Sequence, residues 1–174
     1  IVASSLNEIQ AGLSASADEL TWVQTSYLIA EVVAIPLSGF MSRMMSTRNY
    51  YVMSALGFTL ASLACAFAWD INSMIVFRAL QGFLGAGMIP TTMGSIFIMF
   101  PPEKRVLPVV LVGMVTTMAP ALGPTIGGYI TNALSWHWLF LINLAPGLII
   151  PAVVWMMIRI DKPDWDLLKK IDFP

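Results

Sequence analysis

Long apolar segments separated by short polar links are the feature that most constrains how this chain can fold. Five stretches, each of about 20 residues or more, consist mainly of Val, Ile, Leu, Met, Phe, Ala and Gly. A helix needs about 20 such residues to cross a bilayer, whereas a spanning β-strand needs only about 10. The segments therefore predict membrane-spanning helices at about 21–42, 50–69, 73–99, 106–131 and 137–158, after the tail of an earlier span at about 1–10.

The composition leads to the same class of protein. Hydrophobic residues make up 57% of the chain and charged residues only 11%, whereas soluble domains carry about a quarter charged residues. We therefore expect an all-α integral membrane protein. The net charge of −1 argues against a nucleic-acid partner. With one cysteine and one histidine, we expect neither a metal site nor a bound cofactor.

The basic residues predict how the helices are oriented in the membrane. If the spans alternate in direction, every Lys and Arg except Arg78 falls in links on one side. By the positive-inside rule this side is cytoplasmic, which predicts a multi-pass protein of the cell (inner) membrane with cytoplasmic basic loops. We expect residues 1–158 to form a transmembrane bundle and 159–174 a cytoplasmic linker to the rest of a longer protein.

Two polar stripes lie on otherwise apolar helices. At about 100° per residue, each set of polar or small side chains falls on one helix face. The two sets are Gln24, Tyr27, Glu31, Ser38 and Ser42 in the second segment, and Arg78, Gln81, Gly85 and Thr92 in the fourth. Lipid offers such groups no partner, so each stripe is expected to face the protein interior or a water-filled cavity.

Glu31 and Arg78 are the ionisable groups of these stripes. Glu31 lies about 15 Å into its span, close to the bilayer midplane. A carboxyl there, whose protonation depends on access to water and on a nearby arginine, suits a proton-coupled carrier. A static buried ion pair is the alternative interpretation. Arg78 lies only about 7–8 Å deep, so it either contacts Glu31 directly or extends to the outer interface.

The fifth segment contains the run APALGPTIGG, rich in proline and glycine. Pro120 and Pro124 each remove a helix hydrogen bond, which predicts a bent helix. Gly123 and Gly127 have the spacing that lets a second helix backbone approach closely. This segment therefore predicts a shaped packing surface, and packing alone is the alternative to a role in transport.

Four motifs, in order, resemble the N-terminal half of a major facilitator superfamily transporter, in its fourteen-helix drug:proton antiporter branch. TWVQTSYLIAEVVAIPLSG resembles the second helix of that branch, and WHWLFLINLAPG resembles the entry to its sixth helix. FRALQG matches the fourth-helix pattern Arg-x-x-Gln-Gly with Arg78, Gln81 and Gly82. APALGPTIGG is similar to the fifth-helix antiporter motif, with Gly123, Pro124, Gly127 and Gly128. The resemblance implies a six-helix bundle with only the tail of its first helix present.

The loop after the second helix departs from the family pattern. Gly39 is retained, but Arg43 stands where the family has an aspartate, which puts the usual cytoplasmic latch in doubt. Glu31 occupies a second-helix position where an amide or small residue is more familiar in the family.

By resemblance, the complete protein would be a secondary active transporter and not an enzyme, exporting lipophilic or cationic drug-like compounds in exchange for protons. The proton gradient would be its energy source. Glu31 would bind and release protons, Arg78 would adjust the pKa of Glu31, and Gln81 would link the two residues. Gln24, Tyr27, Ser38, Gly85 and Thr92 would line the substrate cavity. A periplasmic adaptor and an outer-membrane channel would be partners in a Gram-negative bacterium.

Other functions remain open at this point. A proton-coupled symporter or exporter of a small metabolite would show a cavity with more hydrogen-bonding residues than these sparse stripes. An integral-membrane enzyme would need clustered His, Asp or Ser at a membrane face, and a structural assembly subunit would not need a carboxyl at the midplane.

Overall fold

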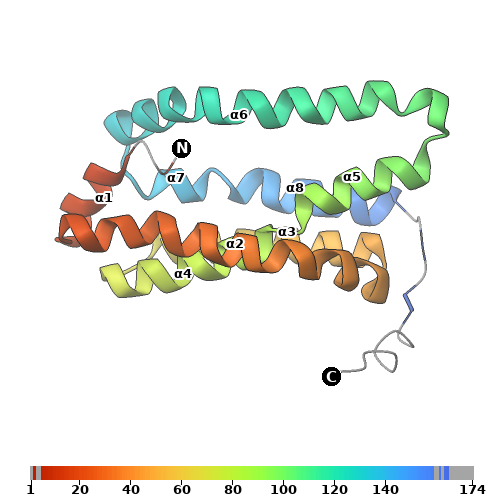
Figure 1. Ribbon diagram of the computed structural model, residues 1–174. Helices are drawn as coiled ribbons and strands as arrows, with labels where there is room; N and C mark the ends of the chain where they lie inside the picture. Colours follow the sequence, from red (N-terminus) through yellow and green to blue (C-terminus); the bar gives the residue numbers. More distant parts are fainter. Residues whose placement is uncertain (1, 3–4, 159–160, 162, 165–174) are drawn as a thin grey trace.

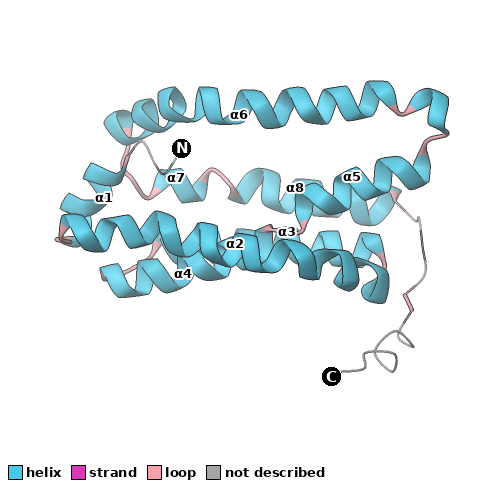
Figure 2. Cartoon of the chain, in the orientation of Figure 1, coloured by secondary structure: helices cyan, strands magenta, loops and turns pink. Residues whose placement is uncertain are grey.

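The computed structural model is a bundle of helices that run back and forth along a shared direction (Figure 1). It describes residues 2, 5–158, 161 and 163–164, and these contain helices but no strand (Figure 2). The helices are α1 (Leu6–Leu13), α2 (Ala17–Met45), α3 (Thr47–Ala66), α4 (Ile71–Gly85), α5 (Met88–Met99), the short 3₁₀ turn η2 (Pro102–Lys104), α6 (Val106–Ala133), α7 (Trp138–Leu141) and α8 (Leu144–Met157). The predicted all-α fold is confirmed.

Two helices begin with reciprocal side-chain caps. At the start of α2, Ser16 and Glu19 exchange hydrogen bonds between their side chains and backbone amides. Asp70 and Ser73 do the same at the start of α4, and the bonds from Ser73 lower the pKa of the Asp70 carboxyl. Such caps satisfy amides that have no partner inside the helix, so they fix where each span begins.

Two of the expected spans are interrupted, and a proline explains each break. The range 73–99 consists of α4 and α5, separated by a turn at residues 86–87. Pro90 has no N–H to donate to the Ala86 carbonyl four residues earlier, so the helix is not continued there. The range 137–158 consists of α7 and α8, and Pro146 likewise leaves the Ile142 carbonyl without its helical donor.

Helix α3 is the polar helix at the centre of the packing. It contacts α4 and α8 along its length, while α4 also packs along α2. Its residues Ser54, Thr59 and Ser62 are all buried. Lipid offers hydroxyls no partner, so this face of α3 lies inside the bundle. Thr59 donates to the Ala55 carbonyl of its own helix, and Ser62 accepts from Gln81 of α4. Helix α6 lies along one side of the bundle (Figure 1) and contacts the remainder mainly through α7 and α5.

Four helical stretches are long and apolar enough to cross a membrane: Ala17–Met45, Ile71–Met99, Val106–Ala133 and Trp138–Met157. Helix α3, with 20 residues, reaches about 30 Å and matches the hydrocarbon thickness in length. Helices α2 and α4 run in one direction and α3 in the other (Figure 1). The α2–α3 turn, the α5–α6 link and the end of α8 therefore lie at one end of the bundle. The chain is a multi-pass membrane protein.

Candidate functional site

Arg78 is held in place by contacts with three groups from two helices. It is only 6% exposed. Its Nε donates to the Val23 carbonyl of α2 at 3.3 Å, and Nη1 donates to Gln81 Oε1 at 2.5 Å. The guanidinium also lies over the ring of Tyr27, 4.2 Å from its centroid. A buried cation requires such partners, so Arg78 is an inward-facing residue and does not extend to the outer interface.

The hydrogen bonds continue from Arg78 into the centre of the bundle. Gln81 is 1% exposed and donates through Nε2 to Ser62 Oγ at 2.5 Å. Ser62, in α3, also lies 3.5 Å from Asn143 Nδ2, at the junction of α7 and α8. A chain of polar groups therefore joins α2, α4, α3 and the start of α8 inside the membrane-spanning region.

Glycine at position 82 allows α2 and α4 to approach this closely. A Cβ atom built on Gly82 would overlap the backbone carbonyl of Tyr27. Ser26 Oγ donates to the Ile75 carbonyl at 3.2 Å and adds a second α2–α4 link. Because the two backbones are this close, the Arg78 side chain is long enough to reach the Val23 carbonyl on α2.

Glu31 lies at the midpoint of α2, about 21 Å from either end. It is half-buried, and within the described part of the chain it forms no hydrogen bond and no ion pair. The structure thus resolves the open question: Arg78 and Glu31 do not form a direct pair. Glu31 still lies within electrostatic range of Arg78 and Tyr27. An unpaired carboxyl at this depth is stable if it is protonated or reaches water.

Gln24 and Tyr27 lie near Arg78 on α2, and both are half-buried. Oε1 of Gln24 is buried without a hydrogen-bond partner, which is unusual for an amide oxygen. The structure brings Tyr27, Arg78 and Gln81 together, with Gln24 one turn before Tyr27 and Glu31 one turn after it.

The other residues of the predicted stripes lie elsewhere. Gly85 packs against the ring of Phe58, because a Cβ there would come within 2.6 Å of that ring. Thr92 donates to the Met88 carbonyl at 2.7 Å and lines a hollow of about 150 Å³ between α3, α5 and α8. The two residues therefore do not share a cavity with Glu31, and the turn at residues 86–87 separates Thr92 from the Arg78 cluster.

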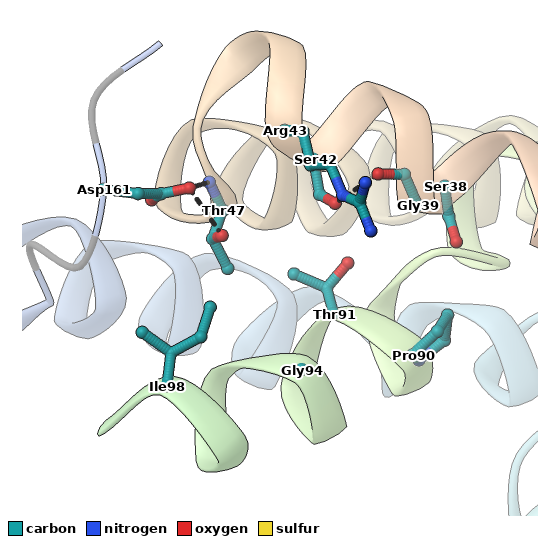
Figure 3. Close-up of a pocket in the computed structure, with 10 residues that line it drawn as sticks. All are labelled: Ser38, Gly39, Ser42, Arg43, Thr47, Pro90, Thr91, Gly94, Ile98 and Asp161. Carbon is teal, nitrogen blue, oxygen red and sulfur yellow. Dashed lines mark hydrogen bonds between the residues drawn. The ribbon is translucent and has the colours of Figure 1, made fainter. Parts of the chain in front are cut away.

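Ser38, Gly39 and Arg43 line a cavity of about 280 Å³ between the ends of α2 and α5. Figure 3 shows Thr91 of α5 directed from the opposite side toward Ser42 and Arg43. The Thr91 hydroxyl is buried without a hydrogen-bond partner. This cavity is at the far end of α2 from Arg78, so Ser38 does not belong to the same site as Tyr27.

The rim of this cavity includes a contact between distant parts of the sequence. The Asp161 carboxylate accepts hydrogen bonds from the Thr47 amide at 3.0 Å and from Thr47 Oγ1 at 2.8 Å. The amide of Asp164 donates to the Met44 carbonyl at 3.1 Å. A carboxylate at the first residue of α3 satisfies an otherwise free amide and complements the helix dipole.

In α6 the glycines of the predicted motif are buried and the prolines are not. Gly123 and Gly127 are buried, Gly128 is half-buried, and Pro120 and Pro124 are exposed. The helix is continuous through both prolines. Ser5 and Thr131 approach to 3.5 Å beside this surface. Thr131, one turn after Gly127, thus lies where α6 meets the start of the chain.

The arrangement around Arg78 can fix a positive charge inside the membrane and hold it beside an aromatic ring and a carboxyl. Sequence reasoning missed Ser62, Thr91 and Asp161, because single hydroxyls or carboxylates in such segments have no distinctive spacing. Asn143 lies in the predicted sixth-helix motif, but its contact with Ser62 depends on the packing of α8 against α3.

Comparisons with known proteins agree on a family. The Major Facilitator Superfamily model matches residues 1–171. The colistin resistance protein EmrB of Acinetobacter baumannii is 57% identical over 99% of this chain and 34% of its own length. The fatty acid resistance protein FarB of Neisseria gonorrhoeae is 36% identical over 87% of this chain and 30% of its own length. The multidrug export protein EmrB of Escherichia coli (strain K12) is 34% identical over 87% of this chain and 29% of its own length.

The chain thus spans about a third of the length of the curated relatives it matches.

A solved structure supports the fold. A bacterial homologue of the human lysosomal transporter Spinster, crystallised in an inward-facing and unoccupied conformation, superposes with a TM-score of 0.72. The match covers 94% of this chain and 40% of that one at 18% identity, so the likeness concerns the fold alone.

Proposed function

This chain belongs to the major facilitator superfamily, and we propose that the protein containing it is a proton-coupled exporter of lipophilic or cationic drug-like compounds. The family consists of transporters, so the chain is part of a transporter and not of an enzyme. The names of the relatives support export of toxic compounds: colistin resistance, fatty acid resistance and multidrug export.

The observation that carries the proposal is an unpaired carboxyl at the midpoint of a spanning helix, near a buried arginine that is held by two hydrogen bonds and an aromatic ring. Glu31 has no ionic partner among the described residues, whereas Arg78 has partners on each side. Proton exchange needs a group whose charge can change at low cost. An ion pair would lock Glu31 in its charged form, and the absence of one leaves the carboxyl responsive.

Each residue then has a distinct role in the proposed cycle. Glu31 takes up a proton when its side of the cavity opens to the outer solution and releases it to the cytoplasmic side. Arg78 stays charged and favours release of that proton, because a nearby cation stabilises the carboxylate. Tyr27 covers the guanidinium, and Gln81 keeps it at a fixed distance from Glu31. A lipophilic cation would favour the deprotonated carboxylate, which links substrate binding to proton release.

We propose the inner membrane as the location, with the end of the bundle that carries Arg43 and Arg48 facing the cytoplasm, as the positive-inside rule requires. In a Gram-negative host, a periplasmic adaptor and an outer-membrane channel would complete the export path. The substrate cavity of the whole protein would lie near the midplane, between this bundle and a second one.

Export can be tested in cells. We expect the full-length protein, produced in a host without its main efflux pumps, to reduce ethidium accumulation severalfold. A protonophore should restore accumulation, because the proposed energy source is the proton gradient. The matched control is a host with the empty vector. Equal ethidium accumulation with and without the protein, together with equal accumulation of a fluorescent fatty acid, would contradict the proposed function.

A further inference from the structure

Ser62 occupies the centre of the buried hydrogen-bond chain, although it contacts neither Arg78 nor Glu31. It is 1% exposed. Its Oγ accepts from Gln81 Nε2 at 2.5 Å and lies 3.5 Å from Asn143 Nδ2. Both neighbours are amides that donate, so Ser62 acts as the shared acceptor between α4 and the α7–α8 junction.

The bond to Ser62 holds the NH₂ end of the Gln81 amide, while Arg78 holds its oxygen end. An amide has one accepting and one donating end, and both ends of Gln81 are used. Oε1 accepts from Arg78 Nη1, while Nε2 donates to Ser62. Without an acceptor at position 62, the buried NH₂ group would lose its partner. The Gln81 amide would then be held at one end only, by the bond that Oε1 accepts from Arg78, and its NH₂ end would shift toward another acceptor.

A displaced amide would move the charge of Arg78 relative to its titratable neighbours, because Nη1 stays bonded to Oε1. These are Tyr27 and Glu31 on α2 and Cys65 on α3. Arg78 would keep its bond to the Val23 carbonyl and its contact with the Tyr27 ring, so the protein would remain folded. What changes is the position of Nη1, the part of the guanidinium that depends on Gln81.

Asn143 connects the same group to a break in the sixth span. It precedes α8 directly and lies where Pro146 interrupts the helix. Gly147 lies one turn further on, so close to Thr59 of α3 that a Cβ at position 147 would overlap the threonine side chain. Movement of α8 against α3 would therefore change the distance from Asn143 to Ser62.

We infer that Ser62 is a positioning residue, which orients the Gln81 amide and thereby fixes Arg78 for the proton-coupled step, and that Asn143 relays the position of α8 to it. This inference rests on the proposed function. Ser62 touches neither substrate nor proton in this arrangement, and its effect is transmitted through Gln81.

The test uses Ser62→Ala in the full-length protein, reconstituted in proteoliposomes with ethidium as the probe. We expect kcat to fall roughly fivefold, the loss that one buried hydrogen bond implies. KM for ethidium should change less, and the midpoint of the pH profile of transport should move by about half a unit. Ser62→Thr keeps the hydroxyl and should restore the wild-type pH profile.

The matched control is Ser54→Ala. Ser54 is buried in the same helix about two turns earlier, and within the described residues it forms no hydrogen bond. We expect this variant to keep the wild-type kcat and pH profile. If Ser62→Ala behaves like Ser54→Ala, or if Ser62→Thr behaves like Ser62→Ala, the positioning role is wrong.

A second measurement, the unfolding temperature, tests the link between Ser62 and Gln81 independently of transport. Ser62→Ala should lower the unfolding temperature of the wild-type protein but have little further effect in a Gln81→Ala background, because the bond is already lost. Equal effects in both backgrounds would overturn the link between Ser62 and Gln81. If this coupling is present and wild-type vesicles fail to move ethidium, the proposed function is wrong while the hydrogen-bonded link stands.

Discussion

Replacing Arg78 with lysine is expected to reduce ethidium transport about 100-fold while leaving the protein folded in the membrane. The guanidinium makes three contacts in different directions: with the Val23 carbonyl, with Gln81 Oε1 and with the face of the Tyr27 ring. A lysine ammonium keeps the charge but is a compact group that cannot make all three at once. Transport rates in proteoliposomes, normalised to the amount of reconstituted protein, measure the loss.

Arg48→Lys is the matched control for this experiment. Arg48 also lies over an aromatic ring, 4.3 Å from the centroid of Trp155, but no hydrogen bond of its side chain occurs among the described residues. We expect transport to change less than about twofold, since a single cation–π contact to the exposed ring of Trp155 is weak. If Arg78→Lys and Arg48→Lys give the same transport rate, Arg78 is an anchor and not part of the coupling site.

Gly82→Ala is expected to cause the largest loss of stability, about 3 kcal/mol in the free energy of unfolding. The added methyl group would overlap the Tyr27 backbone carbonyl. A backbone group cannot turn aside as a flexible side chain does, so α2 and α4 must separate. Separation also removes the bond from Arg78 to the Val23 carbonyl. Denaturant titration of the purified full-length protein measures the change.

Gly94→Ala tests whether this loss is specific. Gly94 lies further along the same span, in α5, where a Cβ would meet no atom within 4 Å. We expect an unchanged or slightly higher stability, because alanine favours helix by up to about 1 kcal/mol over glycine. Equal destabilisation by Gly82→Ala and Gly94→Ala would show that the α2–α4 contact is not the cause.

The spanning helices could be predicted from the sequence because their signal is local. A run of about 20 apolar residues has few alternatives to a membrane helix. The breaks at residues 86–87 and 142–143 also had a local signal, since Pro90 and Pro146 each lack a donor four residues after the break. Pro120 and Pro124 show the limit of this rule, because α6 continues through both.

The candidate site was predictable only where it depends on one helix. The spacing of Arg78 and Gln81 places both on one face of α4, and the structure joins them by a hydrogen bond. The relation of Arg78 to Glu31 depends instead on how far α2 is shifted along α4. That shift is set by contacts such as Gly82 against Tyr27, which helical periodicity does not contain.

Ser62 and Ser38 also show that helical periodicity does not predict the contacts of a single hydroxyl. Ser62 shares a face of α3 with Thr59, whose hydroxyl bonds within its own helix, yet Ser62 is bonded to Gln81 of α4. Ser38 shares a face of α2 with Glu31, yet it lines the cavity near Arg43 at the end of the bundle (Figure 3). In each case the function of a hydroxyl depends on which helix packs beside it.

The proposed exchange of protons for substrate, with Glu31 as the responsive carboxyl, is tested most directly by substrate-induced proton release. Ethidium is added to the full-length protein in weakly buffered proteoliposomes, and the pH change is compared between the wild type and Glu31→Gln. The wild type should release protons as ethidium binds. Glu31→Gln has nearly the same shape but cannot ionise, so its release should be abolished. Undiminished proton release by Glu31→Gln would contradict the role of Glu31, and no release by the wild type would contradict proton-coupled export itself.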